Sequence, residues 1–244
     1  MFPLLAALVL TVTSCSRGEL FRQYEYEEEI YLSLDGSATV YVNTSVAALD
    51  ALRGAPFDAS PNGQISRNDV RAWFTTPVTR VTPAPNTFRR SGRRFVHVRL
   101  DVDDIKHLSE AAPFAWSSYR FTRQGDEYVY EQRLGAAAGR DAGHAGWNGR
   151  EAVAFRLHLP SRITGQNSGT AVRRGNIIVW EQPLADRLRG APLTLTARMQ
   201  TRSILYRTLW LFGATFAAVA AAFGLVIWWV MRRPVRGSHH ADTV

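Results

Sequence analysis

Four arginines near the middle of the chain have the spacing expected of a phosphate-binding turn. Arg89, Arg90, Arg93 and Arg94 flank a Ser-Gly pair. A two-residue turn at that pair would place four guanidinium groups at the tip of a β-hairpin, and guanidinium groups bind phosphate through paired hydrogen bonds. An arginine-rich surface turn without a ligand has the same pattern. Binding of lipid head groups by these four residues is therefore a hypothesis.

Carboxylates form a second group, in a segment where polar and apolar residues alternate. Glu25, Glu27 and Glu29 are two residues apart, so a β-strand would place them on one face. Like charges this close can shift pKa values or bind a cation. We favour pairing with arginines of a neighbouring strand, such as Arg99 or Arg156, because charged faces of half-exposed strands are common.

No sequence pattern predicts a metal site, a cofactor or a catalytic residue. None of the six histidines has metal-ligand spacing to another histidine or to the single cysteine, and one cysteine excludes an internal disulfide. His97 and His158 fall on polar faces of predicted strands, where surface imidazoles are expected rather than a catalytic pair. The Gly-x-Ser-x-Gly motif, the P-loop and the dinucleotide-binding fingerprint do not occur. We therefore expect no metal, no cofactor and no enzyme activity.

The start of the chain resembles an export signal. Residues 4–12 form an apolar run that is too short to span a bilayer. Val12-Thr13-Ser14 then precedes Cys15, as in bacterial lipoprotein signals, where the cysteine becomes the acylated N-terminus. The run lacks the Lys or Arg that usually opens such signals, so an ordinary signal peptide with an incidental cysteine is the alternative. We predict a signal peptide over residues 1–14 and lipidation of Cys15.

A second apolar stretch, near the C-terminus, is long enough to cross a membrane. Residues 209–231 contain no charged residue, and their length fits a helix through a hydrocarbon core of about 30 Å. Aromatic residues lie at both ends, and three arginines follow within residues 232–236. Because positive flanks stay in the cytoplasm, we predict a transmembrane helix over residues 205–231, a short basic cytoplasmic tail over residues 232–244 and an extracytoplasmic main domain.

Between these two ends the dominant hydropathy period is two, which is typical of β-strands. Alternation predicts strands over residues 24–34, 95–102, 116–133, 153–159, 177–180 and 193–199, and Val40 and Val42 continue the pattern after the first of them. Asp35-Gly36 and Gln124-Gly125-Asp126 are predicted hairpin turns, the second inside the segment 116–133. Since such alternation leaves one face buried and one face wet, the sheet is expected to be antiparallel.

Predicted helices are few and short. Ser45 can cap a helix over residues 46–52, and Ser66 can cap the next one. Two more are expected near residues 103–108 and over residues 183–188. The fold class is therefore α+β, a mainly antiparallel β-sheet with a few short helices, plus one C-terminal transmembrane helix.

Residues 15–204 are predicted to form one extracytoplasmic, β-rich domain. Residues 135–150 read GAAAGRDAGHAGWNGR, and we expect them to be a flexible insertion that is too rich in glycine to pack. The strands predicted after this insertion are too few to form a second core, so one domain is preferred to two.

The order of these patterns resembles that of LppM-type domains of bacterial lipoproteins. The resemblance lies in Tyr24–Thr44, Leu157–Pro160, Asn167, Ile177–Trp180 and Leu193–Met199, followed by the closing membrane helix. The glycine-rich insertion and the uncharged signal start depart from the pattern. The resemblance implies that the chain is an envelope protein anchored in the membrane, with this architecture. It says little about a biochemical activity.

Charge and targeting together narrow the class of function. A net charge of +8 suits an anionic surface such as lipid head groups, and export disfavours nucleic acid as a partner. The sequence predicts a non-enzymatic, membrane-anchored bacterial envelope protein that binds lipid or a protein partner through its β-rich domain. The alternatives are an envelope hydrolase or transferase using carboxylates and a histidine, and a subunit of a membrane complex assembled through its transmembrane helix.

Overall fold

The computed structural model describes residues 23–60, 62–141, 143, 145–171 and 176–232. The chain divides into two compact units, Met1–Thr201 and Arg202–Val244, which are described separately. The predicted signal peptide, Cys15 and the tail from residue 233 onward lie outside the described residues.

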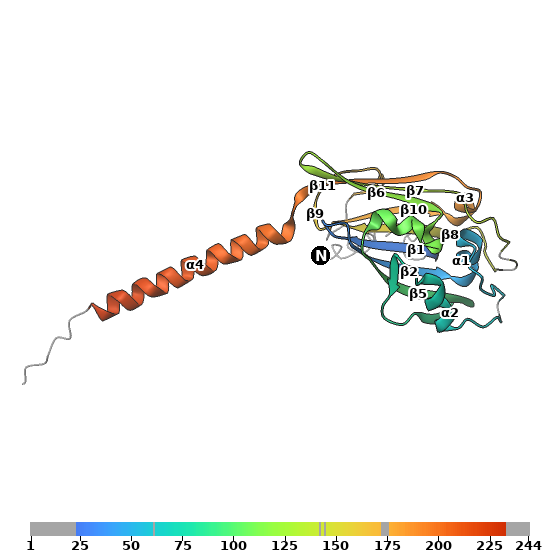
Figure 1. The fold of residues 1–244 in the computed structure, drawn as a ribbon, viewed down its shortest axis with the longest axis horizontal. Helices are drawn as coiled ribbons and strands as arrows, with labels where there is room; N and C mark the ends of the chain where they lie inside the picture. Colours follow the sequence, from blue (N-terminus) through green and yellow to red (C-terminus); the bar gives the residue numbers. More distant parts are fainter. Residues whose placement is uncertain (1–22, 61, 142, 144, 172–175, 233–244) are drawn as a thin grey trace, which may run out of the picture. The chain divides into compact units, whose positions relative to one another are not determined.

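The first unit contains two β-sheets where the sequence suggested one. Sheet A has seven strands: β1 Gln23–Leu32, β2 Ala38–Ser45, β3 Thr79–Val81, β4 Asn86–Arg90, β5 Arg93–Val102, β8 Glu151–His158 and β10 Ile177–Pro183. Their order is β10-β8-β1-β2-β5-β3, and β4 pairs with β5. Sheet B has the order β6-β7-β11-β9, with β6 Ser117–Gln124, β7 Glu127–Leu134, β9 Ser161–Gln166 and β11 Leu193–Ser203. The two sheets lie against each other (Figure 1).

In sheet A, pairing is antiparallel except between β1 and β8, which are parallel, and in sheet B β7 pairs antiparallel with both β6 and β11. The alternation in each strand carries no information on its partner, so the parallel β1–β8 pair was not expected. A register shift between Tyr24 and Tyr26 interrupts it. The α+β class with mainly antiparallel strands is confirmed.

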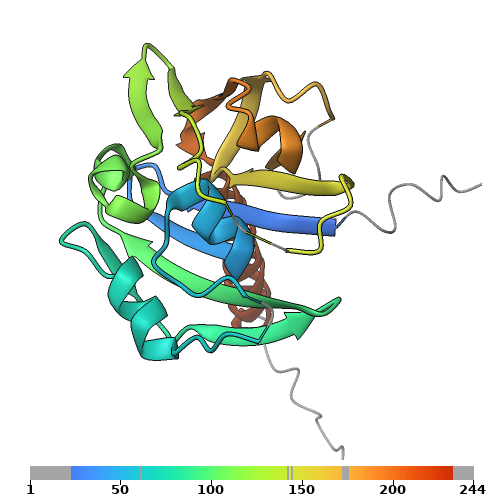
Figure 2. The ribbon, with the colours of Figure 1, turned by 90° about the vertical axis from the view of Figure 1, so that its right-hand side faces the viewer.

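Short helices cover one face of sheet A, and two of them begin at the predicted caps, Ser45 and Ser66. They are α1 Val46–Arg53, α2 Arg67–Phe74 and α3 Leu184–Leu188, with the 3-10 segments η1 Ile105–Glu110 and η2 Ala112–Phe114. The side chains of Ser45, Ser66 and Asp104 each accept a hydrogen bond from a backbone N–H in the first turn that follows. Figure 2 shows α1 and α2 against the strands of sheet A.

The core lies where the alternating apolar positions predicted it. Val40, Val42, Val98, Leu100 and Leu157 are among its members and expose at most 2% of their surface. Burial of this apolar surface, at about 25 cal/mol per Å², holds the sheets and helices together.

The glycine-rich segment differs from expectation, because some of its residues pack. Ala137 and Trp147 lie against the core. The Ala138 N–H donates to the Leu52 carbonyl at 3.1 Å, at the end of α1. The prediction that the segment is too rich in glycine to pack is therefore wrong for these residues.

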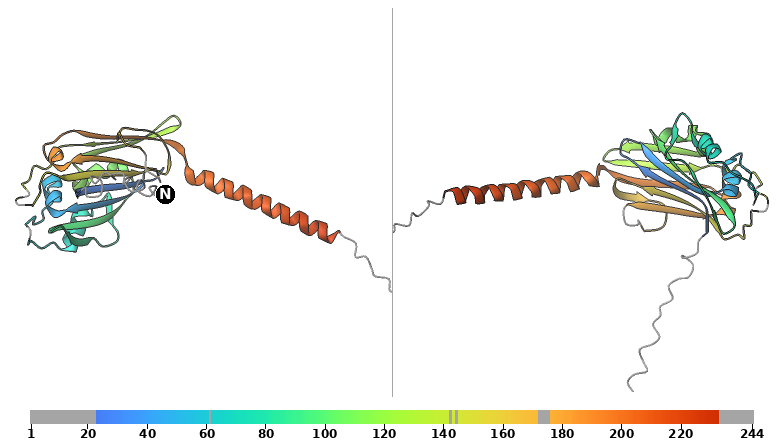
Figure 3. Two further views of the ribbon diagram at one scale, coloured as in Figure 1. Left: turned by 180° about the vertical axis from the view of Figure 1, so that it is seen from behind. Right: turned by 90° about the horizontal axis from the view of Figure 1, so that it is seen from below.

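The second unit contains α4, Ile204–Met231, which is one continuous helix (Figure 3). Its segment Thr208–Met231 has a mean hydropathy of 2.1, and this helix is long and apolar enough to cross a membrane. At its end, the Arg232 guanidinium lies 4.1 Å from the centre of the Trp228 ring.

Candidate functional site

The four arginines lie on the predicted hairpin, β4–β5. Arg90 pairs with Arg93 and Arg89 with Arg94 across the two strands. Ser91 and its glycine neighbour form the turn with φ values of 51° and 77°. Positive φ at both central residues matches the twist of a two-residue hairpin, which explains the Ser-Gly pair.

Arg93 turns into the domain and pairs with buried carboxylates. Its guanidinium lies 3.3 Å from Glu25 and 3.5 Å from Glu151, and it donates to the Gly146 carbonyl at 3.1 Å. Burial raises the pKa of Glu25, while a hydrogen bond from Ser45 and the charge of Arg93 oppose this rise. The charge of Arg93 is thus largely compensated inside the protein.

Arg90 and Arg94 also contact the chain itself. Arg90 donates to the Tyr24 carbonyl and lies 4.1 Å from the centre of the Phe95 ring. Arg94 donates to the Ser60 carbonyl at 2.8 Å and to that of Asp58. Arg89 is exposed. The turn therefore does not present four equivalent guanidinium groups, which sequence spacing alone suggested.

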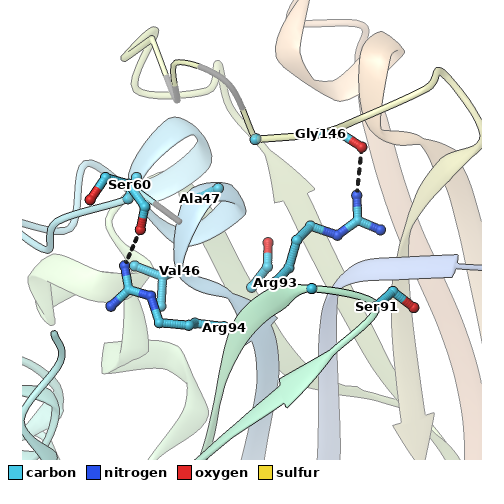
Figure 4. A pocket seen from close by; sticks show the side chains of 11 residues that line it. Val46, Ala47, Ser60, Ser91, Arg93, Arg94 and Gly146 are labelled. Atoms are coloured by element: carbon cyan, nitrogen blue, oxygen red, sulfur yellow. Dashed lines mark hydrogen bonds between the residues drawn. The ribbon is translucent and has the colours of Figure 1, made fainter. Parts of the chain in front are cut away.

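A cavity of about 190 Å³ lies between Arg93 and Arg94 (Figure 4). Its walls are the start of α1, residues 59–60, the β4–β5 turn and residues 145–146. Figure 4 shows Arg93 and Arg94 pointing toward opposite walls, with Val46 and Ala47 of α1 between them. Two guanidinium groups beside the positive end of a helix favour an anion, although Glu25 and Glu151 offset part of that charge.

Glu27 and Glu29, which are half-buried, are paired with basic residues of β8. Glu27 lies 2.6 Å from Arg156, one of the two expected partners, whereas Arg99 lies 3.5 Å from Asp101 instead. Glu29 lies 2.5 Å from His158. The hydrogen bond from His158 lowers the pKa of Glu29, and partial burial opposes that shift.

His97 and His158 are not brought together. They lie on β5 and β8, with β1 and β2 between them, which is a separation of about 14 Å at normal strand spacing. A hollow of about 130 Å³ lies on this face of sheet A, lined by Glu27, Glu29, Tyr41, Asn43, His97 and Arg156. The described residues contain no group of three or more His, Cys, Asp or Glu that could hold a metal ion.

Sequence reasoning missed a buried ion pair. Glu28 exposes 1% of its surface, and its carboxylate lies 2.6 Å from Arg53 at the end of α1. Glu28 also accepts hydrogen bonds from Tyr26 at 2.8 Å, Gln132 at 2.9 Å and Tyr119 at 3.2 Å. Glu28 is in phase with the apolar residues of β1, so the alternation contained the signal that it is buried.

This network joins both sheets to α1. Tyr119 and Gln132 come from sheet B, Glu28 from sheet A, and the Arg53 guanidinium lies 3.9 Å from the centre of the Trp116 ring. Burial raises the pKa of Glu28 to about 7, against the hydrogen bonds from Gln132 and Tyr119. Burial also lowers the pKa of Arg53 to about 9. Both oxygens of the Glu28 carboxylate accept hydrogen bonds inside this network, whereas Arg53 Nε and Trp116 Nε1 are buried without a hydrogen-bond partner among the described residues. We assign the network a structural role, because it links the two sheets to α1.

Comparison with known proteins finds a likeness among solved structures but not among protein families or curated sequences. No protein-family model and no curated protein matches the sequence. Among solved structures, the chain is similar to the folded domain of the LppM protein of Mycobacterium tuberculosis, determined by NMR. The match has 14% identity and a TM-score of 0.40, and it covers 75% of this chain and 96% of the other.

Proposed function

We propose that this chain is a membrane-anchored bacterial envelope protein without enzyme activity, whose β-rich domain binds anionic lipid or a protein partner outside the cytoplasm. The observation that carries the anchor is α4, whose 24 residues Thr208–Met231 form an apolar helix of membrane-spanning length. Arg232 follows directly and favours a cytoplasmic C-terminus. Acylation of Cys15 would add a second anchor.

Lipid binding is supported by the β4–β5 hairpin and the cavity beside it. Arg89 is exposed, and Arg93 and Arg94 line the cavity. Because Arg93 holds two buried carboxylates, we assign the phosphate of a lipid head group to Arg89 and Arg94 rather than equally to all four arginines.

Native mass spectrometry of the full chain, extracted from its own membranes, tests this function. The parent should carry an acyl mass on Cys15 and retain anionic lipid, and the paired variant Arg89→Gln/Arg94→Gln should lose most of that lipid. Arg80→Gln is the control, since Arg80 pairs with exposed Asp103 elsewhere on the domain. Equal lipid retention by all three proteins would contradict the lipid assignment.

A second candidate is an envelope hydrolase or transferase, favoured by the Glu29–His158 contact beside the hollow that Glu27 and His97 line. A carboxylate that orients an imidazole is a common general-base arrangement. If this candidate holds, Glu29→Gln should reduce ester hydrolysis by the purified chain at least tenfold at a temperature where thermal unfolding shows both proteins to be folded.

A further inference from the structure

We infer that the outer edge of β4 docks on an anionic bilayer, with Phe88 entering the interface between head groups and acyl chains and Arg89 contacting phosphate. This inference rests on the proposed function, because it requires that the chain is membrane-bound. The inference adds an apolar contact between Phe88 and the bilayer to the contacts with lipid head groups that the sequence suggested for the arginines.

Phe88 is one of two large apolar side chains that the described part of the first unit exposes, the other being Tyr31. It exposes 36% of its surface and stacks on Phe95, with ring centres 5.5 Å apart. Phe95 is fully buried and fixes the position of the outer ring. An exposed ring next to arginines is the pairing found where a protein surface rests on a lipid interface.

Phe88 and Arg89 border one open hollow. This hollow has a volume of about 470 Å³ and lies between residues 62–65 and the strand that carries Thr87, Phe88 and Arg89. Arg94 and Phe95 complete its lining. A phospholipid carries acyl chains close to its phosphate. The rings in this hollow would contact the acyl carbons, and the guanidinium groups would contact the phosphate.

The β4–β5 hairpin lies close to the residue where the chain enters the domain. β1 starts at Gln23, and the Tyr24 carbonyl accepts a hydrogen bond from Arg90 of the hairpin. Cys15 precedes Gln23 by eight residues, which reach at most about 28 Å when fully extended. An acyl chain on Cys15 would therefore hold the hairpin end of the domain near the lipid surface.

Site-directed fluorescence on the full chain in lipid nanodiscs tests the inference. Phe88→Cys is labelled with an environment-sensitive dye, in nanodiscs of equal parts phosphatidylglycerol and phosphatidylcholine with brominated acyl chains. The dye must not react with Cys15. This thiol is therefore either acylated, as mass spectrometry verifies, or removed by Cys15→Ser. The dye at position 88 should show blue-shifted emission and at least twofold stronger bromine quenching than the same dye in nanodiscs of brominated phosphatidylcholine alone.

The same labelled chain in nanodiscs of phosphatidylcholine alone is the matched control, because the protein, the dye and the anchors are unchanged and only the anionic head groups are removed. Adding Arg89→Gln should reduce the quenching at position 88, and so should nanodiscs of phosphatidylcholine alone. Aqueous-like emission at position 88 in both kinds of nanodisc, from a chain that remains with the nanodiscs, would overturn this inference alone. A chain that does not remain with the nanodiscs would overturn the proposed function as well.

Discussion

At the scale of single residues, Glu28 and Arg53 matter most for the stability of the domain. Each side chain exposes at most 1% of its surface, so neither charge is solvated by water. The attraction between the two charges and the hydrogen bonds from three neighbours replace that solvation. Removing one partner therefore leaves a buried charge uncompensated, whereas removing both does not.

Arg53→Met should destabilise the protein by about 3–5 kcal/mol, because Glu28 then lies buried without its counter-charge. Glu28→Leu/Arg53→Met should recover a large part of this loss. Urea unfolding of the full chain in detergent, followed by tryptophan fluorescence, measures both. Arg80→Met should change the stability by less than about 1 kcal/mol, since the Arg80–Asp103 pair is exposed. A stability loss of less than about 1 kcal/mol for Arg53→Met would contradict the conclusion that Arg53 and Glu28 form a buried ion pair.

The Glu29–His158 contact should make stability depend on pH in the acid range. The folded-state pKa of Glu29 is lowered by the hydrogen bond from His158. A lowered carboxylate pKa gives stability that is complete above the unfolded value of about 4.3 and is lost as the pH falls through the folded value. The parent should therefore lose more stability than Glu29→Gln between pH 5 and pH 3, measured by thermal unfolding. Parallel pH curves for the two proteins would contradict this assignment.

At the scale of elements, the short helices depend on their caps more than on their length. α2 has eight residues, too few for independent stability, and only Val70 and Phe74 of its residues are buried. The Ser66 hydroxyl accepts a hydrogen bond from the Asn68 N–H at 3.1 Å. The cap and two apolar side chains therefore hold this helix on sheet A.

Ser66→Ala should destabilise the protein by about 1 kcal/mol, because the Asn68 N–H loses its acceptor. Ser66→Asp is the control and should retain most of the stability, since aspartate accepts the same hydrogen bond and suits the positive end of a helix. Chemical denaturation measures both variants. If Ser66→Ala equals the parent, the cap contributes nothing to α2.

At the scale of the whole molecule, the first unit has two distinct ends. β1 begins beside the β4–β5 hairpin, as the Arg90–Tyr24 hydrogen bond shows. β11 runs toward the opposite end, where the Thr201 N–H donates to the carbonyl of Asp126 in the β6–β7 turn. The chain thus enters the domain at one end and leaves it at the other, so the two proposed anchors leave from different ends.

Cys15→Ser should block signal processing and the uptake of labelled fatty acid, yet the protein should stay in the membrane fraction because α4 remains. Removing residues 205–244 from the Cys15→Ser variant should release the chain from integral association with the membrane. Metabolic labelling and carbonate extraction measure these outcomes. A cytoplasmic reporter fused after Val244 should be active, and activity of an export-dependent reporter at that position would contradict the proposed topology.

The sequence by itself determined the local elements, because hydropathy period, capping residues and turn residues act over a few positions. Val40 and Val42 alternate into the core, Ser45 and Ser66 cap helices, and the Ser-Gly pair turns the hairpin as predicted. The long apolar segment likewise predicts α4 from composition alone.

Only the tertiary structure decided which residues meet across the chain. The parallel β1–β8 pair, the division into two sheets and the Glu28–Arg53 contact join segments far apart in sequence, and periodicity carries no information on such partners. The same reason explains the arginines. Their spacing predicted a shared turn, but the contacts of Arg93 with Glu25 and Glu151 assign that side chain to the interior.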